Sequence, residues 1–218
     1  MNQLIRKSLY NYLSLIYKKH KPQELNSICN QIQKIFPLKD FKKKNNNFWD
    51  EKDCFLITYA DSIKKKNNNN FSTLRLFLNK YCKDFSYIHI LPFYPYSSDD
   101  GFAVIDYEKI KSDHGTWDDF FKLSKNFKIM SDLVINHCSS KNNLFKNFLK
   151  GNDPGLDFFI SSKTNFNKFS KVVRPRSSKL SKKVKISEEK HYVWCTFSHD
   201  QIDFNFKNPD VLLFFLNI

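Results

Sequence analysis

The sequence predicts an α/β fold built on a parallel sheet. Between residues 54 and 137, three short apolar runs rich in strand-forming residues alternate with two stretches of helical spacing. The apolar runs are nearly continuous, which is typical of parallel strands buried on both faces. The chain has 218 residues, of which 41% are hydrophobic, so it can bury a core of its own.

Two helices are expected ahead of this sheet. Residues 3–17 and 22–36 both carry apolar residues at helical spacing. Pro22 opens the second stretch, and proline is favoured at the first position of a helix. A run of lysine and asparagine at residues 42–47 then ends the helical pattern.

The predicted elements of the sheet follow in order. They are a strand at 54–60, a helix at 71–82, a strand at 87–93, a helix at 116–126 and a strand at 127–137. Thr116 is expected to cap the second of these helices, with acidic residues in its first turn. Asp132 lies inside the last apolar run, where a buried carboxylate needs a partner. Taken alone, Asp132 fits a structural role and an active-site role equally well.

Beyond His137 the regular alternation ends. Residues 143–150 form one short helical stretch, whereas residues 151–200 show no sustained period and are expected to be an irregular excursion from the sheet. A last helix is predicted at 208–218, because Asn208 is a favourable cap and Pro209 is a favourable first residue.

Composition limits the function classes. The formal net charge of +14 is compatible with a polyanionic partner. The lysine excess occurs together with asparagine, as in residues 42–47 and 64–70, and no nucleic-acid-binding module accompanies it, so we expect solvated loops and no nucleic-acid partner. The five cysteines show no metal-ligand spacing, which indicates reduced thiols, a cytoplasmic location and no metal site. The N-terminus is expected to be neither a signal peptide nor a membrane span.

Two polar loops follow the second and third predicted strands. Because the carboxyl ends of parallel strands meet at one edge of a sheet, side chains from both loops are expected to converge there. The candidates are Asp99, Asp100, Asp106, Asn136 and His137. A simpler interpretation stays open for single residues, since an Asp-Asp-Gly sequence also makes a turn and a histidine at a strand end is commonly structural.

These loops carry a specific resemblance. "DDGFAVIDY" (99–107) and "DLVINH" (132–137) resemble two signature segments of the α-amylase superfamily, glycoside hydrolase family 13. Four longer or additional segments resemble the sucrose phosphorylase and glucosylglycerate phosphorylase group: "ILPFYPYSSDDGFAVIDY", "HGTWDDF", "VVRPRSS" and "VWCTFSHDQIDFNFKNPDVL". The resemblance extends from about residue 55 to the last residue, and "SSDDGF" is closer to the glucosylglycerate type.

The resemblance implies a fold and its division into parts. The family fold is a (β/α)8 barrel with a smaller domain B inserted after the third strand. The chain would then hold the first three β/α units and the domain B insertion. The expected parts are an N-terminal helical segment at 1–50, the first part of the barrel at 51–140, domain B at 141–206, and the start of the helix that returns to the barrel at 207–218.

The resemblance also implies roles for individual residues. Asp99 would accept hydrogen bonds from glucosyl hydroxyls, Phe102 would be an apolar platform, and His137 would donate to a hydroxyl. Domain B would complete the set of substrate-binding residues, which is Asp99, Phe102, His137, Phe197 and Gln201. Supporting positions behind this set would be Asp106, Tyr107, Asp132 and Asn136.

The chemistry of the group is retaining glucosyl transfer, in which phosphate takes the glucosyl unit from a covalent intermediate. The family's nucleophile lies in an R-x-D segment that this sequence does not contain, so no catalytic residue is expected here. The implied partners are a glucoside and phosphate as co-substrate, with no metal or organic cofactor. The expectation is an N-terminal portion that is inactive and poorly soluble alone, with a separately encoded C-terminal half as one way to complete it.

Several readings stay open on the sequence. The chain is also compatible with a non-catalytic sugar-binding remnant or with a glycoside hydrolase of the same superfamily. A nucleic-acid binder rests on net charge alone. The identity of the glucoside, and the choice between phosphorolysis and hydrolysis, depend on subsites that these motifs do not specify.

Overall fold

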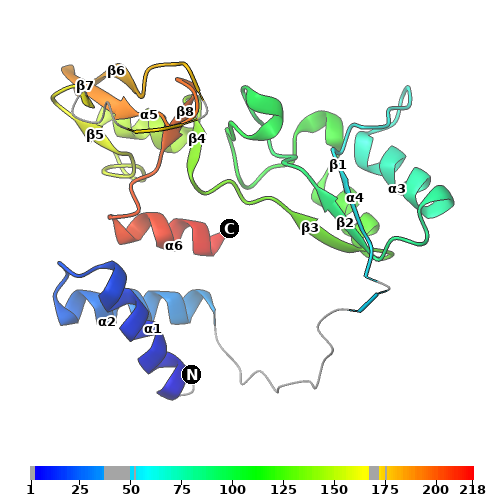
Figure 1. Cartoon of the computed structure of the whole chain (residues 1–218), viewed down its shortest axis with the longest axis horizontal. Coiled ribbons are helices and arrows are strands. Elements are labelled where there is room, and N and C mark those ends of the chain that lie inside the picture. Colours follow the sequence, from blue (N-terminus) through cyan, green and yellow to red (C-terminus); the bar gives the residue numbers. More distant parts are fainter. Residues whose placement is uncertain (1–2, 37–49, 52, 167–171, 175) are drawn as a thin grey trace. The chain divides into compact units, whose positions relative to one another are not determined.

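The computed structural model describes residues 3–36, 50–51, 53–166, 172–174 and 176–218 (Figure 1). The chain forms two compact units, one made of Met1–Asn46 with Asn205–Ile218 and the other of Asn47–Phe204. The lysine-asparagine run at 42–47 lies outside the described residues. Across the described part of the chain, no helix combines the length and the apolar character that crossing a bilayer requires.

The first unit is helical. It contains α1 (Gln3–Ile16), α2 (Pro22–Ile35) and α6 (Pro209–Asn217), so the helices predicted at 3–17, 22–36 and 208–218 are confirmed. Asn208 caps α6, because its side chain accepts a hydrogen bond from the backbone N–H of Asp210 at 3.0 Å. The helices share one core, formed by Leu13, Tyr17, Leu25, Ile28, Cys29, Ile32 and Leu213.

The second unit contains the predicted parallel sheet. Its strands are β1 (Phe55–Thr58), β2 (Tyr87–Ile90) and β3 (Lys128–Ser131), in the order β1-β2-β3 with both pairs parallel. The connections are α3 (Asn70–Tyr81) and α4 (Trp117–Ser124), so the predicted alternation of strand and helix is confirmed (Figure 1).

The core under this sheet is aliphatic and aromatic. Ile88 and Ile90 of the central strand are fully buried. The ring of Phe71 from α3 contacts Phe93 and Phe120 with centroid distances of 5.5 and 5.7 Å. Edge-to-face contacts of this kind add to the free energy that burial of the rings contributes.

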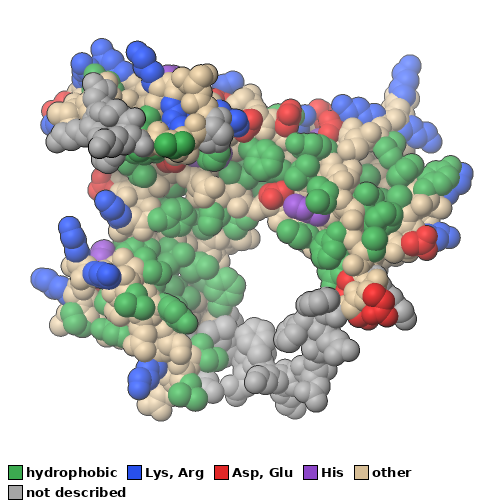
Figure 2. All heavy atoms as spheres, viewed as in Figure 1, with side chains coloured by type: hydrophobic (Ala, Val, Ile, Leu, Met, Phe, Trp, Pro, Cys, Tyr) green, Lys and Arg blue, Asp and Glu red, His purple; other side chains and the backbone are tan. Residues whose placement is uncertain are grey.

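The predicted burial of every strand on both faces is wrong for the two outer strands. In β1, Phe55 and Ile57 are 50% and 62% exposed, and in β3 Met130 is 48% exposed. The register aligns Ile57, His89 and Met130, so the exposed residues share one face of the sheet, and the buried Ile88 and Ile90 lie on the other. Figure 2 shows hydrophobic side chains on the visible face of this sheet. Asp132 follows β3 rather than lying inside it.

The segment after β3 is more regular than predicted. It contains β4 (His137–Ser139), α5 (Asn143–Lys150), β5 (Ser161–Ser162), β6 (Ser181–Ile186), β7 (Glu189–Trp194) and β8 (Gln201–Asp203). Strands β5, β7 and β6 form an antiparallel sheet, and β4 pairs antiparallel with β8. The expectation of an irregular excursion over 151–200 is therefore wrong for the β6–β7 hairpin.

The hairpin turn explains why this part was missed. Ser187 and Glu188 link β6 and β7 with φ values of 46° and 67°, the left-handed pair that a two-residue hairpin turn needs. Asparagine and glycine usually signal such a turn, and neither is present here. The alternation of lysine with valine and isoleucine in β6 was the available signal.

Replacing Thr116 with alanine should lower the free energy of unfolding by about 1 kcal/mol. Its Oγ1 accepts from the backbone N–H of Asp119, and a carboxylate oxygen of Asp119 accepts from the backbone N–H of Thr116 at 3.0 Å. Urea unfolding followed by circular dichroism measures the change. Ser124→Ala at the far end of α4 is the control and should shift stability by less than about 0.5 kcal/mol. Equal effects of both changes would contradict the capping argument.

Candidate functional site

The loop after β2 adopts an unusual backbone conformation. Asp99, Asp100 and Gly101 form η1 (Asp99–Gly101) with φ values of 57°, 48° and 109°. Aspartate tolerates the left-handed region better than most residues. At Gly101 a side chain is excluded, because a Cβ there would lie 2.6 Å from the carbonyl oxygen of Pro92. The turn therefore fixes the Asp99 carboxylate at the carboxyl end of β2.

Gln201 and His137, far away in the sequence, join Asp99 in one cluster. Gln201 in β8 donates from Nε2 to Oδ2 of Asp99 at 2.8 Å, and the same Nε2 lies 3.0 Å from Nε2 of His137 in β4. Gln201 is 1% exposed and His137 is 4% exposed. The antiparallel pair β4–β8 places the last two side chains side by side, with His137 opposite Asp203 and Ser139 opposite Gln201.

His137 is a neutral hydrogen-bonding group. Its Nε2 also lies 3.1 Å from the carbonyl oxygen of Phe102, and a single ring nitrogen cannot donate to Phe102 and accept from Gln201 in the same tautomer. Nδ1 is buried without a hydrogen-bond partner in the described residues. Burial lowers the pKa of His137, and the carboxylates of Asp203 and Asp99 offset this only in part.

Two pockets of about 340 Å³ each open beside this cluster. They share Asp99, Arg176 and Phe197. One is lined in addition by Phe102 and by the run from Asp132 to His137, and the other by Ser98, Ser177, Ser178, Ser198 and Gln201. A concave site with aromatic walls and a few convergent polar groups suits a small polar ligand.

The aromatic and cationic walls lie close to the central cluster. The Phe197 ring is 5.1 Å from the His137 ring, and the Arg176 guanidinium is 5.8 Å from the centroid of Phe197. Among the described residues that line the two pockets, Arg176 is the only lysine or arginine. The geometry thus combines two carboxylates, Asp99 and Asp132, one guanidinium and apolar ring faces within one site.

A buried chain of contacts holds the Phe197 loop. Both oxygens of Asp203 accept hydrogen bonds from Thr196, at 2.8 Å from its backbone N–H and 2.6 Å from its hydroxyl. Burial raises the pKa of Asp203, and these hydrogen bonds limit the rise. Arg174 donates to the carbonyl oxygen of Thr196 at 3.0 Å. The backbone next to Phe197 is therefore fixed from two sides.

Tyr107 and Asn136 support the site from behind. The Tyr107 hydroxyl lies 2.7 Å from the carbonyl oxygen of Val134 and 3.0 Å from that of His137. Burial raises the pKa of Tyr107 well above its ordinary value, so it remains a donor. The carbonyl oxygen of Asn136 accepts a hydrogen bond from the backbone N–H of Phe204. Asn136 also lines one of the two pockets.

Asp132 and Asp106 lie in different surroundings. Asp132 lines one pocket, and its Oδ2 lies within hydrogen-bond distance of Nε2 of His89 at 3.0 Å. Asp106 pairs with Lys109 at 2.9 Å and does not line either pocket, so the expected convergence does not extend to it. In the described part of the chain, no group of three or more His, Cys, Asp or Glu residues could hold a metal ion.

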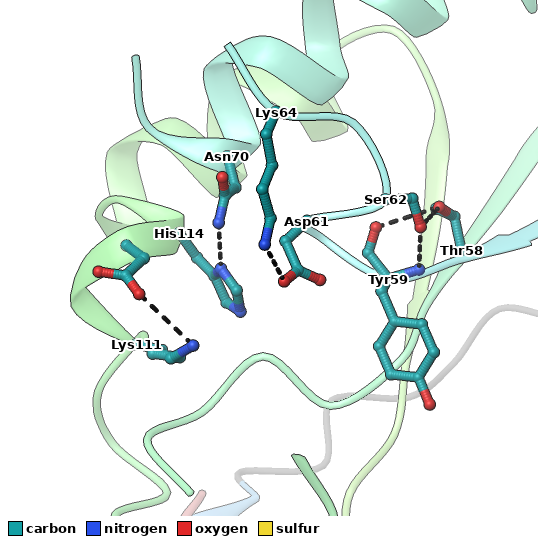
Figure 3. Close-up of polar contacts among 9 residues, drawn as sticks. Thr58, Tyr59, Asp61, Ser62, Lys64, Asn70, Lys111 and His114 are labelled. Atoms are coloured by element: carbon teal, nitrogen blue, oxygen red, sulfur yellow. Dashed lines mark hydrogen bonds and ion pairs between the residues drawn. The ribbon is translucent and has the colours of Figure 1, made fainter. Parts of the chain in front are cut away.

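The loop after β1 reaches the same edge of the sheet. Thr58 donates to the hydroxyl of Ser62, and the backbone N–H of Tyr59 also donates to Ser62, so the turn is closed by local hydrogen bonds. Figure 3 shows the Tyr59 ring pointing away from these contacts, and nearby Asp61 pairs with Lys64 at 3.1 Å. Burial raises the pKa of Tyr59, and the Asp100, Asp99 and Asp132 carboxylates raise it further.

Sequence reasoning gave no site role to Arg176 or Tyr59. Arg176 lies in "VVRPRSS", a segment that carried the family resemblance but has no periodic pattern to place it. The available signal was a pair of arginines followed directly by two serines, a set of donors suited to an anion. Tyr59 lies within the apolar run at 54–60 and is predicted from sequence as a strand residue.

The chain is similar to known proteins over most of its length. The family model for the alpha-amylase catalytic domain matches residues 57–216. A glucosylglycerate phosphorylase of Spirochaeta thermophila is 44% identical over 170 residues, which cover 78% of this chain and 29% of that protein. A glucosylglycerate phosphorylase of Allomeiothermus silvanus is 36% identical over 210 residues, which cover 96% of this chain and 37% of that protein.

The fold of the chain is similar to that of a solved structure. The sucrose 6F-phosphate phosphorylase from Thermoanaerobacter thermosaccharolyticum aligns with a TM-score of 0.67 and 34% identity, over 75% of this chain and 36% of that chain. The present chain spans about a third of the length of the curated relatives that it matches.

Proposed function

The chain belongs to the α-amylase family, and on that premise we propose that it supplies the glucosyl-binding part of an α-glucoside phosphorylase. The observation that carries the proposal is the Asp99–Gln201–His137 cluster beside the pocket that contains Arg176. The glucosylglycerate and sucrose phosphorylases among its relatives support this substrate class.

The proposal includes a finer assignment of the fold. Strands β1, β2 and β3 with α3 and α4 would be the first three units of a (β/α)8 barrel. Residues 141–206 would be domain B, inserted after the third strand. Support comes from the parallel order of the strands and from the antiparallel β5–β7–β6 sheet in the segment that follows. The open edges of β1 and β3 would pair with further strands of the barrel.

The glucosyl unit would bind through its hydroxyls and one apolar face. The carboxylate of Asp99 offers two oxygens, one of which already accepts from Gln201, so a sugar hydroxyl can use the other. Phe102 and Phe197 would cover the apolar face of the ring. Neutral His137 would complete the set as a hydrogen-bonding group.

Phosphate would bind at Arg176. A guanidinium presents its donors in a planar fork that matches phosphate oxygens, and Ser177 and Ser178 line the same pocket. This cation favours phosphorolysis over hydrolysis, because water as the acceptor needs no positive charge. A retaining double displacement requires two carboxyl groups about 5–5.5 Å apart. We assign neither the nucleophile nor the general acid to a residue of this sequence. A further stretch of polypeptide, on the same chain or separately encoded, would supply these two carboxyl groups.

A sugar-binding module without catalysis is the second candidate. It is favoured by a single observation, namely that the cluster contains binding groups but no residue to which the family motif gives a bond-making role. Both candidates require the same sugar contacts, so an assay of turnover separates them.

Calorimetric titration of the full chain with glucose, sucrose and glucosylglycerate tests the proposal. Saturable binding of a glucosyl ligand is expected. Glucose 1-phosphate should form from phosphate and sucrose or glucosylglycerate, with release of fructose or glycerate, once the polypeptide with the reacting carboxylates is present; glucose itself has no glycosidic bond to break and serves only as a binding ligand. Sugar binding without turnover in that reconstituted sample would favour the binding module, free glucose as the product would indicate a hydrolase, and the absence of any sugar binding would refute both candidates.

Replacing Arg176 with alanine should weaken phosphate binding by about tenfold or more, because the site loses its charge-assisted hydrogen bonds. Glucose affinity should change by less than about threefold, since glucose carries no charge for the guanidinium to pair with. Calorimetric titration with phosphate measures the change in phosphate affinity, and titration with glucose measures the change in glucose affinity. Lys179→Ala, a nearby lysine that lines neither pocket, is the matched control. Equal losses in both variants would mean that the effect is general electrostatics.

A further inference from the structure

A single carboxylate next to the sugar cluster gathers hydrogen bonds from several serines. Asp200 accepts from the hydroxyl of Ser98 at 2.7 Å, from that of Ser140 at 2.5 Å, and from Ser97. The Ser97 hydroxyl also lies 2.5 Å from that of Ser139. We call these five residues, Ser97, Ser98, Ser139, Ser140 and Asp200, the serine clasp.

The serine clasp joins three separate segments. Ser97 and Ser98 belong to the loop after β2, whereas Ser139 and Ser140 lie at the end of β4. Asp200 directly precedes β8, and its carbonyl oxygen accepts from the backbone N–H of Ser140 at 2.8 Å. Burial alone would raise the pKa of Asp200, but the serine hydroxyls outweigh it and hold the pKa below its usual range. The carboxylate is therefore ionised, the state that accepts best.

The serine clasp lies next to Gln201, so it constrains the position of the Gln201 side chain. Gln201 follows Asp200 directly, and its amide must reach Asp99 in the loop after β2 and His137 in β4 at the same time. Strand β8 has three residues, so its ladder to β4 is short and fixes the strand weakly. The clasp ties β8 to the same two segments that the Gln201 amide contacts. The clasp therefore holds the loop after β2 and strand β4 at a fixed distance from Asp200, the residue next to Gln201.

We propose that Asp200 is a positioning residue, which through the serine clasp holds the Gln201 amide between Asp99 and His137. The expected effect of Asp200 on sugar affinity rests on the proposed function, but its positioning role does not. The positioning itself is a statement about three side chains of this chain, and it has a readout that needs no ligand.

That readout is the titration of His137, followed by NMR in the full chain and assigned with His137→Gln. The groups that face the ring are the Asp99 and Asp203 carboxylates, the Gln201 amide, the Phe102 carbonyl oxygen and the Phe197 ring. In Asp200→Ala the amide should withdraw and water should enter. The pKa of His137 should then rise from its lowered value toward about 6.5. Asp200→Asn keeps one acceptor oxygen and should give a smaller rise.

Asp119→Ala is the matched control for a purely structural role. The Asp119 carboxylate also gathers hydrogen bonds, from the Thr116 backbone and hydroxyl, Ser72 and Asn69. Against the effect of burial, the Thr116 and Ser72 donors and the Lys122 charge lower its pKa. It lies at the start of α4 and lines neither pocket. Its loss should reduce the melting temperature but leave the His137 titration unchanged.

The outcomes are decisive in each direction. A His137 titration in Asp200→Ala that matches the wild type would overturn the proposal, as would an equal shift in Asp119→Ala. If Asp200→Ala does not fold, the double variant Ser97→Ala/Ser98→Ala removes two donors while keeping the carboxylate, and it should shift the titration in the same direction. No shift in that folded double variant would also refute the clasp.

A second arm measures glucose affinity by calorimetry. Asp200→Ala should bind glucose about tenfold more weakly than the wild type, while Asp119→Ala should bind it equally well. Unchanged glucose affinity in Asp200→Ala would contradict the proposed contribution to the sugar site. A wild-type chain that binds no sugar would refute the proposed function, and the His137 titration would still decide the role of Asp200.

Discussion

Replacing Asp99 with alanine should weaken glucose binding by about 100-fold. A hydrogen bond to a charged acceptor is worth about 1.5–3 kcal/mol, which corresponds to roughly 10- to 150-fold in affinity. The upper part of this range applies because the same change also removes the acceptor that fixes the Gln201 amide, which then keeps only its contact with His137. Calorimetric titration of wild type and variant at one salt concentration measures the ratio.

The neighbouring residue offers a close control for this experiment. Asp100 has the same charge and the same left-handed backbone conformation, but it lines neither pocket. Asp100→Ala should change glucose affinity by less than about twofold. Equal losses in Asp99→Ala and Asp100→Ala would trace the effect to the turn or to net charge. Wild-type affinity in Asp99→Ala would remove the sugar contact that the proposed function requires.

Helices were predictable from sequence because their signals are local. The caps Thr116 and Asn208 and the opening Pro22 each act within one turn, so the sequence around them is sufficient. Strand ends were less predictable. The apolar run at 127–137 continues past Ser131, where β3 ends, because residues after a strand can stay apolar while they line a pocket.

Some residues of the candidate site were predictable from sequence and others were not. Asp99 and His137 follow predicted strands, so the topology of a parallel sheet was enough to bring them to one edge. Gln201 lies in a three-residue strand that has no detectable period, and only the family resemblance pointed to it. The serine clasp depends on residues about a hundred positions apart, and no local pattern could pair Ser97 with Asp200. Long-range polar networks of this kind are visible only in three dimensions.

Replacing Phe159 with alanine should lower the free energy of unfolding by about 3–5 kcal/mol. Phe159 is 2% exposed, and its ring lies 5.0 Å from Phe204, 5.1 Å from Phe145 and 5.3 Å from Phe148. The change removes a large apolar surface and leaves a cavity that three rigid rings cannot fill by small shifts. Guanidinium unfolding followed by circular dichroism measures the loss.

The same cavity should also reach the sugar site. Phe159 and Phe204 form a β-bridge, and Phe204 directly follows β8, so a looser ring cluster frees the strand that carries Gln201. Phe159→Leu keeps most of the volume and should cost less than Phe159→Ala in both stability and glucose affinity. The exposed Phe121→Ala should change stability by less than about 0.5 kcal/mol and leave affinity unaltered. A Phe159→Ala chain that loses stability but binds glucose as well as the wild type would separate the ring cluster from the site, and the positioning of Gln201 would then depend on the serine clasp and the β4–β8 ladder alone.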